Sequence, residues 1–327
     1  MITVVGEAVM DLVRSVHGAT TAHPGGSPAN VAVGLGRLGH PVALLTRLGQ
    51  DAHGAQLAAH LAGSGVALVG GVVDDHPTST AIAHTDVSGG ATYEFAITWH
   101  LDGPEPDGLP ARSACLHTGS IAATLEPGAG TVRRLMERAR GRCTVSYDPN
   151  CRPSLMGHPE EARARIESLV ASADVVKASD EDLAWLHPGR DVVDVAREWL
   201  ALGPAVVVVT RGGTGSVGLC REGAVARPAV PVEVTDTVGA GDAFMAGLLD
   251  ALYRRGLLGV DHADRLHGID TRALGELLDE ASLVSAVTCT RPGANPPTAE
   301  ELAAFREGRG RAGQESLPLA EGGGAVM

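Results

Sequence analysis

The sequence predicts an α/β protein with a doubly wound, mostly parallel sheet flanked by helices. Three observations support this fold class. Apolar stretches rich in β-branched residues alternate with stretches of helical period, and most glycine-rich or polar motifs follow the apolar stretches. The chain of 327 residues is also 44% hydrophobic, which is enough for a large core. Such alternation is typical of parallel strands joined by crossover helices, whose ligands bind at the carboxyl ends of the strands.

Apolar residues spaced two apart indicate strands, and apolar residues spaced three or four apart indicate helices. The expected strands are Ile2–Val5, Val42–Leu48, Cys143–Tyr147, Val175–Val176 and Ala205–Thr210. The expected helices are Ala29–Leu38, Gly54–Ser64, Gly130–Arg140, Glu160–Ala171, Asp180–Leu186 and Ala273–Thr290.

Two segments depart from this alternation. Residues 78–98 form two strand-like runs around Gly89-Gly90, which predicts a β-hairpin, either separate from the main sheet or at its edge. The segment from Gly308 to Met327 is glycine-rich and has no periodic pattern, so we expect it to be disordered. The folded domain is therefore expected to cover residues 1–307.

Composition excludes several classes of function. The net charge of −13 argues against nucleic acid as a partner, and no apolar run is long enough to cross a membrane. The N-terminus lacks the pattern of a signal peptide, which favours a cytoplasmic protein. The five cysteines form no C-x-x-C and the thirteen histidines show no ligand spacing, so no metal site is expected from either residue type.

The most informative motif is Asp236-Thr-Val-Gly-Ala-Gly-Asp242, which precedes a helix-like stretch. Backbone N–H groups of Gly239, Ala240 and Gly241, together with the start of a helix, would form a hole for phosphate oxygens. A carboxylate beside such a hole is unfavourable for phosphate binding alone. It is useful if Asp242 removes a proton from a hydroxyl that attacks a phosphoryl group. The alternative is a glycine turn whose acid stabilises the helix dipole.

A second motif, Gly25-Gly26-Ser-Pro-Ala-Asn30, stands near the N-terminus. With both motifs in this order, residues 1 to about 305 resemble the ribokinase-like (PfkB) family of carbohydrate kinases. The resemblance implies an ATP-dependent sugar kinase in which Asp242 is the base. It also implies a small β-sheet lid over the sugar, at about residues 12–22 and 75–102, that excludes water.

The resemblance places the sugar site near the early motif. Asp11 is expected to accept hydrogen bonds from sugar hydroxyls. Gly25 and Gly26 would let the backbone approach the sugar, and the amide of Asn30 would contact hydroxyls. Asp11 could otherwise be an ordinary loop residue, and Asn30 an ordinary helix residue.

Three further residues bear on the choice of sugar. Tyr93 and Phe95 resemble the Y-x-F of fructokinase-like members, although Ala96-Ile-Thr-Trp-His100 departs from their usual polar sequence. Arg152, in the D-x-N-x-R pattern of fructokinase-like and ketodeoxygluconate kinase-like members, would bind phosphoryl oxygens or an acidic substrate. A structural ion pair is the alternative for Arg152.

The nucleotide site is expected at the ends of later strands. Lys177 lies two residues before the pattern Ser179-x-x-Asp182. This pattern occupies the position of the family's N-x-x-E. Asp182 is expected to hold Mg²⁺ through water, and Ser179 also suits a helix N-cap. Thr210, Gly212 and Gly215 resemble the family's nucleotide loop.

Two residues near the end of the chain belong to the same expected site. Asn295 would border the adenine, unless it is only a turn residue. Asp236 would help to bind a monovalent cation such as K⁺. Whether the cation is required, and whether the protein forms a homodimer through the lid, stay open.

Other interpretations are weaker. Gly34-Leu-Gly36-Arg-Leu-Gly39 spells a dinucleotide fingerprint, but it lies inside a predicted helix and does not follow a strand. We interpret Gly34 and Gly36 as packing positions and Gly39 as a C-terminal cap, which disfavours a dehydrogenase. No P-loop motif is present. Fructose is the favoured acceptor, with ketodeoxygluconate, ribose and nucleosides as alternatives and a non-catalytic sugar-responsive protein as a different class.

Overall fold

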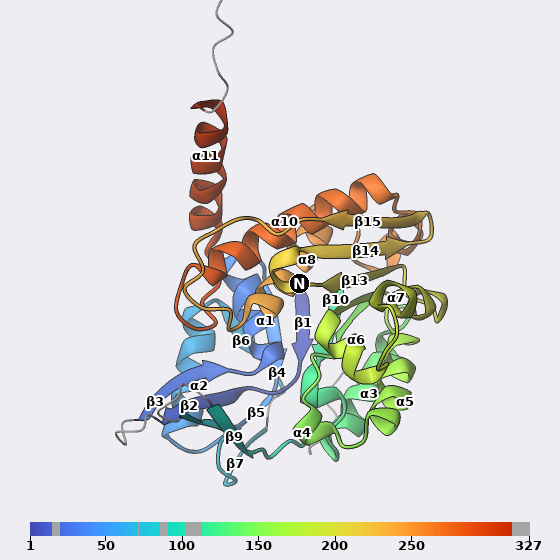
Figure 1. Ribbon diagram of the computed structural model, residues 1–327. Helices are drawn as coiled ribbons and strands as arrows, with labels where there is room; N and C mark the ends of the chain where they lie inside the picture. Colours follow the sequence, from blue (N-terminus) through green and yellow to red (C-terminus); the bar gives the residue numbers. More distant parts are fainter. Residues whose placement is uncertain (15–19, 71, 86–90, 102–112, 316–327) are drawn as a thin grey trace, which may run out of the picture.

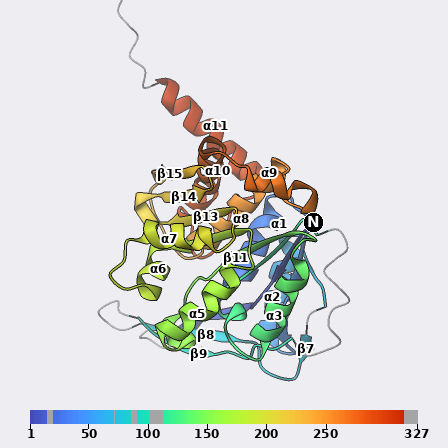
Figure 2. The ribbon, with the colours of Figure 1, turned by 90° about the vertical axis from the view of Figure 1, so that its right-hand side faces the viewer.

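A nine-stranded sheet between two layers of helices forms the body of the molecule (Figures 1 and 2). The computed structural model describes residues 1–14, 20–70, 72–85, 91–101 and 113–315. The strand order is β15-β14-β13-β12-β11-β10-β1-β4-β6, parallel except for β14 and β15. The strands are β1 (Ile2–Val5), β4 (Val42–Leu45), β6 (Val66–Leu68), β10 (Cys115–Gly119), β11 (Thr144–Asp148), β12 (Val175–Ser179), β13 (Val206–Thr210), β14 (Ser216–Cys220) and β15 (Gly223–Arg227).

The helices cover both faces of the sheet, which confirms the predicted fold class. Successive side chains of a strand point to opposite faces, so Val4 and Val5 of β1 enter different core clusters. One face is covered by α1 (Ser27–Arg37), α2 (Ala52–Gly63), α8 (Ala240–Arg254), α9 (Ala263–His267) and α10 (Thr271–Cys289). The other is covered by α3 (Gly128–Ala139), α4 (Pro153–Met156), α5 (Pro159–Val170), α6 (Asp180–Leu186) and α7 (Val192–Ala201).

The predicted elements all occur, with shifted ends and one break. The run expected as one strand, Val42–Leu48, is divided into β4 and β5 (Arg47–Gly49). β5 leaves the main sheet and pairs with β7 (Val72–Asp74), where the buried Arg47 forms an ion pair with Asp74. Apolar content alone could not show this change of partner.

The hairpin predicted around residues 78–98 belongs to a sheet of its own. β8 (Thr80–Thr85) and β9 (Ala91–Ala96) pair antiparallel, and β2 (Val9–Arg14) and β3 (Thr20–Gly25) complete the order β3-β2-β8-β9. The alternative of an edge hairpin in the main sheet is therefore wrong. Gly89-Gly90, expected as its turn, lies outside the described residues. Figure 1 shows this four-stranded sheet at the lower left of the body.

The G-x-G-x-x-G stretch lies in α1 and just beyond it, as predicted. A side chain at Gly34 would collide with Ala246 of α8, so this glycine lets the two helices pack closely. Gly39, with φ +88°, follows the C-cap residue Leu38.

The last helix, α11 (Ala299–Glu315), projects from the body (Figures 1 and 2). The disordered segment expected from Gly308 is therefore wrong for residues 308–315, while 316–327 lie outside the described residues. A capping box begins the helix, because Thr298 Oγ1 accepts from Glu301 N and Glu301 Oε2 accepts from Thr298 N. Once a helix is nucleated, each further residue adds at low cost, so the three glycines at positions 308, 310 and 313 do not end it.

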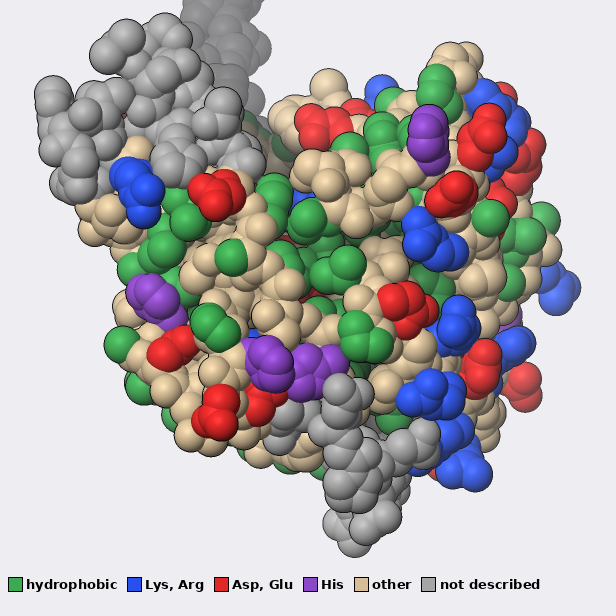
Figure 3. Space-filling model, turned by 90° about the horizontal axis from the view of Figure 1, so that it is seen from below, with side chains coloured by type: hydrophobic (Ala, Val, Ile, Leu, Met, Phe, Trp, Pro, Cys, Tyr) green, Lys and Arg blue, Asp and Glu red, His purple; other side chains and the backbone are tan. Residues whose placement is uncertain are grey.

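Seen from below, the face in Figure 3 has apolar side chains towards its middle and Lys and Arg mostly along one edge. Among the described residues, no helix has both the length and the apolar character to cross a membrane.

Candidate active site

The start of α8 holds the residues of the late motif. Gly239 is the N-cap, with φ +75°, and a side chain there would meet Ala294. The N–H of Ala240 donates to Thr237 O at 3.1 Å, so this one is used in a turn rather than left for an anion. Within the described residues, the N–H groups of Gly239, Gly241 and Asp242 donate to no protein acceptor. The N–H groups of Gly241 and Asp242, in the first turn of α8, can therefore bind an anion together with the helix dipole.

Asp242 is the point at which the early and late motifs meet. Its side chain is in the first turn of α8 and the residue is only 7% exposed. Ser27 Oγ donates to Oδ1 at 2.7 Å and Asn30 Nδ2 to Oδ2 at 2.8 Å. A third, longer bond of 3.4 Å comes from Asn150 Nδ2. These donors are neutral, so they orient the carboxylate without neutralising its charge.

The only lysine of the chain lies beside the same turn. Lys177 Nζ is 2.9 Å from Asp148 Oδ2, and it donates to Gly241 O at 3.4 Å. Burial opposes the charge of Lys177, but the neighbouring Asp148 carboxylate outweighs it and raises the pKa of the ammonium. Burial also raises the pKa of Asp148, to about 6, although Lys177 acts in the opposite direction. A positive charge is thereby fixed behind the anion-binding turn.

Asp11, on β2, faces the same centre from the four-stranded sheet. Burial raises its pKa to about 6; Arg152 opposes the rise, and the charge of Asp242 adds to it. A side chain at Gly25 would overlap Asp11 Oδ2, so any residue other than glycine would displace this carboxylate. Gly26 has φ +96° and lies against the backbone of residues 7–9. The two glycines thus let β3 approach β2 at the site.

Asn150 and Arg152 form the rim between these groups. Asn150 has φ +33°, a conformation that is uncommon outside glycine and concentrates at functional sites. Arg152 Nη1 donates to Asn150 Oδ1 at 2.7 Å, and so supports the amide that contacts Asp242. Within the described part of the chain Arg152 forms no ion pair with a carboxylate, so the structural ion-pair interpretation has no support there.

A cavity of about 580 Å³ lies next to the anion-binding turn. Most residues predicted for the nucleotide line it, together with the residues of the late motif. These are Arg152, Lys177, Ser179, Asp182, Thr210, Gly212, Gly215, Gly239, Ala240, Gly241 and Asp242. The structure therefore brings together side chains that were expected from separate motifs at the ends of β11, β12 and β13.

Ser179 is the N-cap of α6, as predicted, within a capping box. Its Oγ accepts from Asp182 N, and Asp182 Oδ2 accepts from Ser179 N at 2.8 Å. Asp182 Oδ1 accepts from Cys151 N at 2.7 Å. Each carboxylate oxygen retains a further lone pair, so this anchored acid can also orient water at the cavity wall.

Asn295, Asp236 and Phe95 are among the predicted residues that do not line the cavity. Asn295 Oδ1 accepts from Arg37 Nη1 at 2.5 Å, as in a structural turn. Asp236 accepts from Val238 N at 3.0 Å and Gly293 N at 2.8 Å; burial opposes its ionisation, but these N–H groups lower its pKa. Phe95 is half-buried on β9.

The remaining lid residue, Tyr93, pairs with Ala83 in the β8–β9 ladder. Its side chain is outside the described part, so its expected contact with the sugar has no structural counterpart.

The sequence did not predict three polar residues of this region, Ser27, Asn150 and Glu7, as site residues. Ser27 was noted only as part of the early motif, yet it donates to Asp242. Glu7, between β1 and β2, is buried and accepts from Ala122 N at 3.1 Å, and burial raises its pKa to about 7. The sequence signal that could have identified Glu7 is its position as an acid two residues after the buried strand β1.

The chain as a whole is similar to known carbohydrate kinases. Residues 1–301 match the model of the pfkB family of carbohydrate kinases. A fructokinase of Klebsiella pneumoniae is 37% identical over 264 residues, covering 78% of this chain and 85% of that protein. Fructokinase-1 of Oryza sativa subsp. japonica is 35% identical, covering 92% and 96%. The crystal structure of a fructokinase with bound ATP from Xylella fastidiosa has a TM-score of 0.82 and 27% identity, covering 94% of this chain and 98% of that one.

Proposed function

Because the chain belongs to the pfkB family of carbohydrate kinases, we propose that it transfers the γ-phosphate of ATP to a hydroxyl of fructose. The observation that carries this proposal is the setting of Asp242. It lies in the first turn of α8, borders the cavity, and is held by Ser27 and Asn30 of the early motif. Fructose is favoured because relatives named fructokinase are 35–37% identical to this chain.

The reaction follows from these positions. Asp242 takes the proton of the reacting sugar hydroxyl, whose oxygen then bonds to the γ-phosphorus of ATP. The bond from that phosphorus to the β–γ bridging oxygen breaks, and ADP leaves with its electron pair. The N–H groups of Gly241 and Asp242 stabilise the charge that develops on the transferred group. Lys177 adds a fixed positive charge behind them.

ATP is proposed to bind in the cavity, with its phosphates directed to the start of α8. Thr210, Gly212 and Gly215 would contact the nucleotide, because glycines there let the backbone approach it closely. Mg²⁺, when bound with the nucleotide, neutralises phosphate charge. The acidic wall that includes Asp182 fits this ion, since Mg²⁺ keeps much of its water shell.

The sugar is proposed to bind between α1 and the four-stranded sheet. Asp11 would accept from two hydroxyls, and Asn30 would contact a third while it holds Asp242. The sheet would exclude water, which otherwise competes as the phosphoryl acceptor. Tyr93 and Phe95 would supply an apolar wall.

Several predictions about the wider site stay open. Asn295 would border the adenine. Asp236 would help to bind a monovalent cation. A homodimer through the lid and a cytoplasmic location likewise stay predictions.

Measured kcat/KM for fructose, ketodeoxygluconate, ribose and adenosine would test the acceptor. We expect fructose to rank first in wild type and in Arg152→Ala, because Arg152 is tied to Asn150 and needs no substrate carboxylate. If ketodeoxygluconate ranks first and Arg152→Ala removes that preference, the substrate is acidic. If none of the four accepts phosphate, the proposed activity is wrong.

A further inference from the structure

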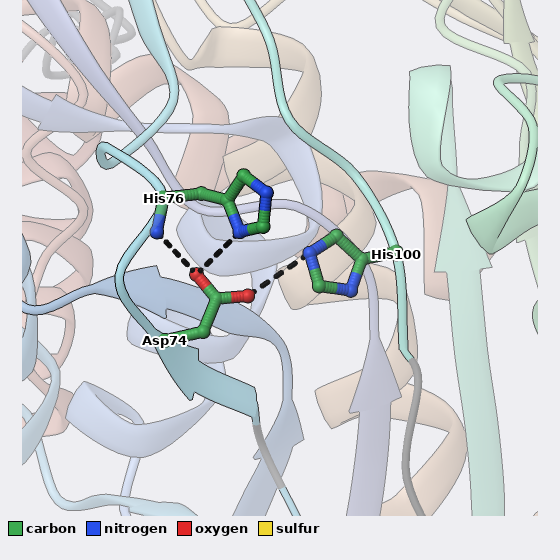
Figure 4. A group of neighbouring side chains, drawn as sticks. All are labelled: Asp74, His76 and His100. Carbon is green, nitrogen blue, oxygen red and sulfur yellow. Dashed lines mark hydrogen bonds and ion pairs between the residues drawn. The ribbon is translucent and has the colours of Figure 1, made fainter.

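Three potential metal ligands meet at the base of the β8–β9 hairpin, away from the cavity lining. Asp74 ends β7, His76 lies in the loop before β8, and His100 follows β9. Figure 4 shows both imidazole rings directed at the Asp74 carboxylate, one from each side. One ligand atom from each residue lies within 4.8 Å of the other two. Segments far apart in sequence thus converge on one point.

Only one of the two imidazole–carboxylate distances is that of an ordinary hydrogen bond. His76 Nδ1 is 3.4 Å from Asp74 Oδ1, longer than an ordinary N–H···O bond. His100 Nε2 is 3.0 Å from Asp74 Oδ2. Ligand atoms at about 2.1 Å from a tetrahedral Zn²⁺ are roughly 3.4 Å apart. Small rotations of the side chains would therefore place all three atoms around one ion.

Arg47 holds the carboxylate in place from behind. Its side chain is completely buried, and it donates to both oxygens of Asp74 and to the backbone O of His76. These two bonds to Arg47 fix the orientation of the Asp74 carboxylate. Each oxygen has more than one lone pair, so Arg47 leaves room for a metal on the opposite side. Such outer partners commonly orient metal ligands, although the guanidinium charge also reduces affinity for a cation.

Access and shielding also fit a metal site. The side chain of His76 is 65% exposed, whereas those of Asp74 and His100 are 22% and 14% exposed. An ion could therefore enter from the His76 side and bind to two largely buried ligands, Asp74 and His100. Two imidazoles and one carboxylate select zinc-like ions over Mg²⁺ or Ca²⁺, which prefer oxygen ligands.

We propose that Asp74, His76 and His100 form a Zn²⁺ site with water in the fourth position. The ligands flank β8 and β9 in the chain, so a bound ion would fasten the base of this hairpin to β7. The site is separate from the phosphoryl-transfer centre, and the proposal does not depend on the identity of the sugar.

The test is direct metal binding to the full chain, freed of any histidine tag and without nucleotide. We expect calorimetric titration with ZnCl₂ at pH 8 to show one site that His76→Ala weakens at least tenfold. His100→Ala should do the same. His158→Ala, which removes an exposed histidine at the start of α5, is the matched control and should bind as wild type does.

Cobalt provides a second measurement. Wild type with CoCl₂ should show the intense visible absorption of a four-coordinate site, and His76→Ala should lose it. Because His76 is largely exposed, this variant should keep the wild-type Tm without metal. If wild type and His76→Ala bind Zn²⁺ equally, or neither binds it, the three residues form only a hydrogen-bonded network and the proposal is wrong.

Discussion

The turn at the start of α8 and the four-stranded sheet meet at the proposed sugar site, but they are built differently. Residues 242–252 of α8 are all buried, and the helix packs against α1 and α10. In β3, by contrast, only Gly25 is buried, and the outer end of β2 is exposed. The proposed catalytic side is thus part of the core, while the proposed covering side is largely surface.

The difference in burial between α8 and the four-stranded sheet fits two different proposed roles. Asp242 needs a fixed direction, and three donors from two other segments supply it. The lid proposed for the four-stranded sheet would have to open and close, which fits a less stable part of the fold with few buried apolar contacts. Changes at α8 should therefore affect the chemical step, and changes on the sheet should affect sugar binding.

Asp242→Asn is the sharpest way to test that division. The amide cannot accept the proton, so we expect kcat to fall by about 10²-fold or more, while the fold and ATP binding are retained. Steady-state kinetics and nucleotide titration would measure both. Asp279→Asn makes the same chemical change in an exposed surface ion pair and should leave kcat unaltered. Near wild-type turnover in Asp242→Asn would show that another group is the base.

Asp11→Ala tests the covering side. Loss of one buried hydrogen-bonding group costs roughly 1–3 kcal/mol, so the fructose KM should rise about ten- to a hundredfold with little change in the ATP KM. Asn30→Ala should raise the fructose KM as well, but it should also lower kcat, because Asn30 holds Asp242. Equal effects of Asp11→Ala on both substrates would contradict its assignment to the sugar.

Gly25→Ala tests whether the approach of β3 to β2 matters. The added methyl would overlap Asp11 Oδ2, so the carboxylate must move and the fructose KM should rise by roughly tenfold. Gly63→Ala, in α2, meets nothing within 4 Å and is the matched control. If the two variants have the same fructose KM, the position of Asp11 is not important for binding.

The same contrast explains what the sequence could predict. The body follows from periodicity, and the ends of α6 and β1 match the predicted residues. The late motif identified the anion-binding turn because small residues before a helix have a local physical meaning. The separate sheet was predictable only as a hairpin, since its pairing of β2 with β8 joins distant segments.

What escaped prediction depends on contacts between such segments. Ser27 and Asn150 become partners of Asp242 only when the starts of α1 and α8 and the loop after β11 converge. His76 and His100 lie on either side of a hairpin, so no local spacing marks them as neighbours. The hydrogen bond from Ala240 N to Thr237 O also depends on a backbone conformation that the sequence Gly-Ala-Gly does not specify.

The last and smallest predicted effect concerns Glu7, which lies between β1 of the main sheet and β2 of the four-stranded sheet. Burial raises its pKa from 4.5 to about 7, so between these values the native state binds a proton that the unfolded chain has released. Stability from this group is present below pH 4.5 and is lost as pH rises through 7, a change of roughly 3 kcal/mol at most.

Glu7→Gln keeps an acceptor for Ala122 N and should remove that dependence. Relative to wild type, the Tm of Glu7→Gln should therefore rise by a few degrees between pH 5 and pH 8, with little change in kcat. A constant Tm difference across this range would show that Glu7 is not buried as a neutral acid.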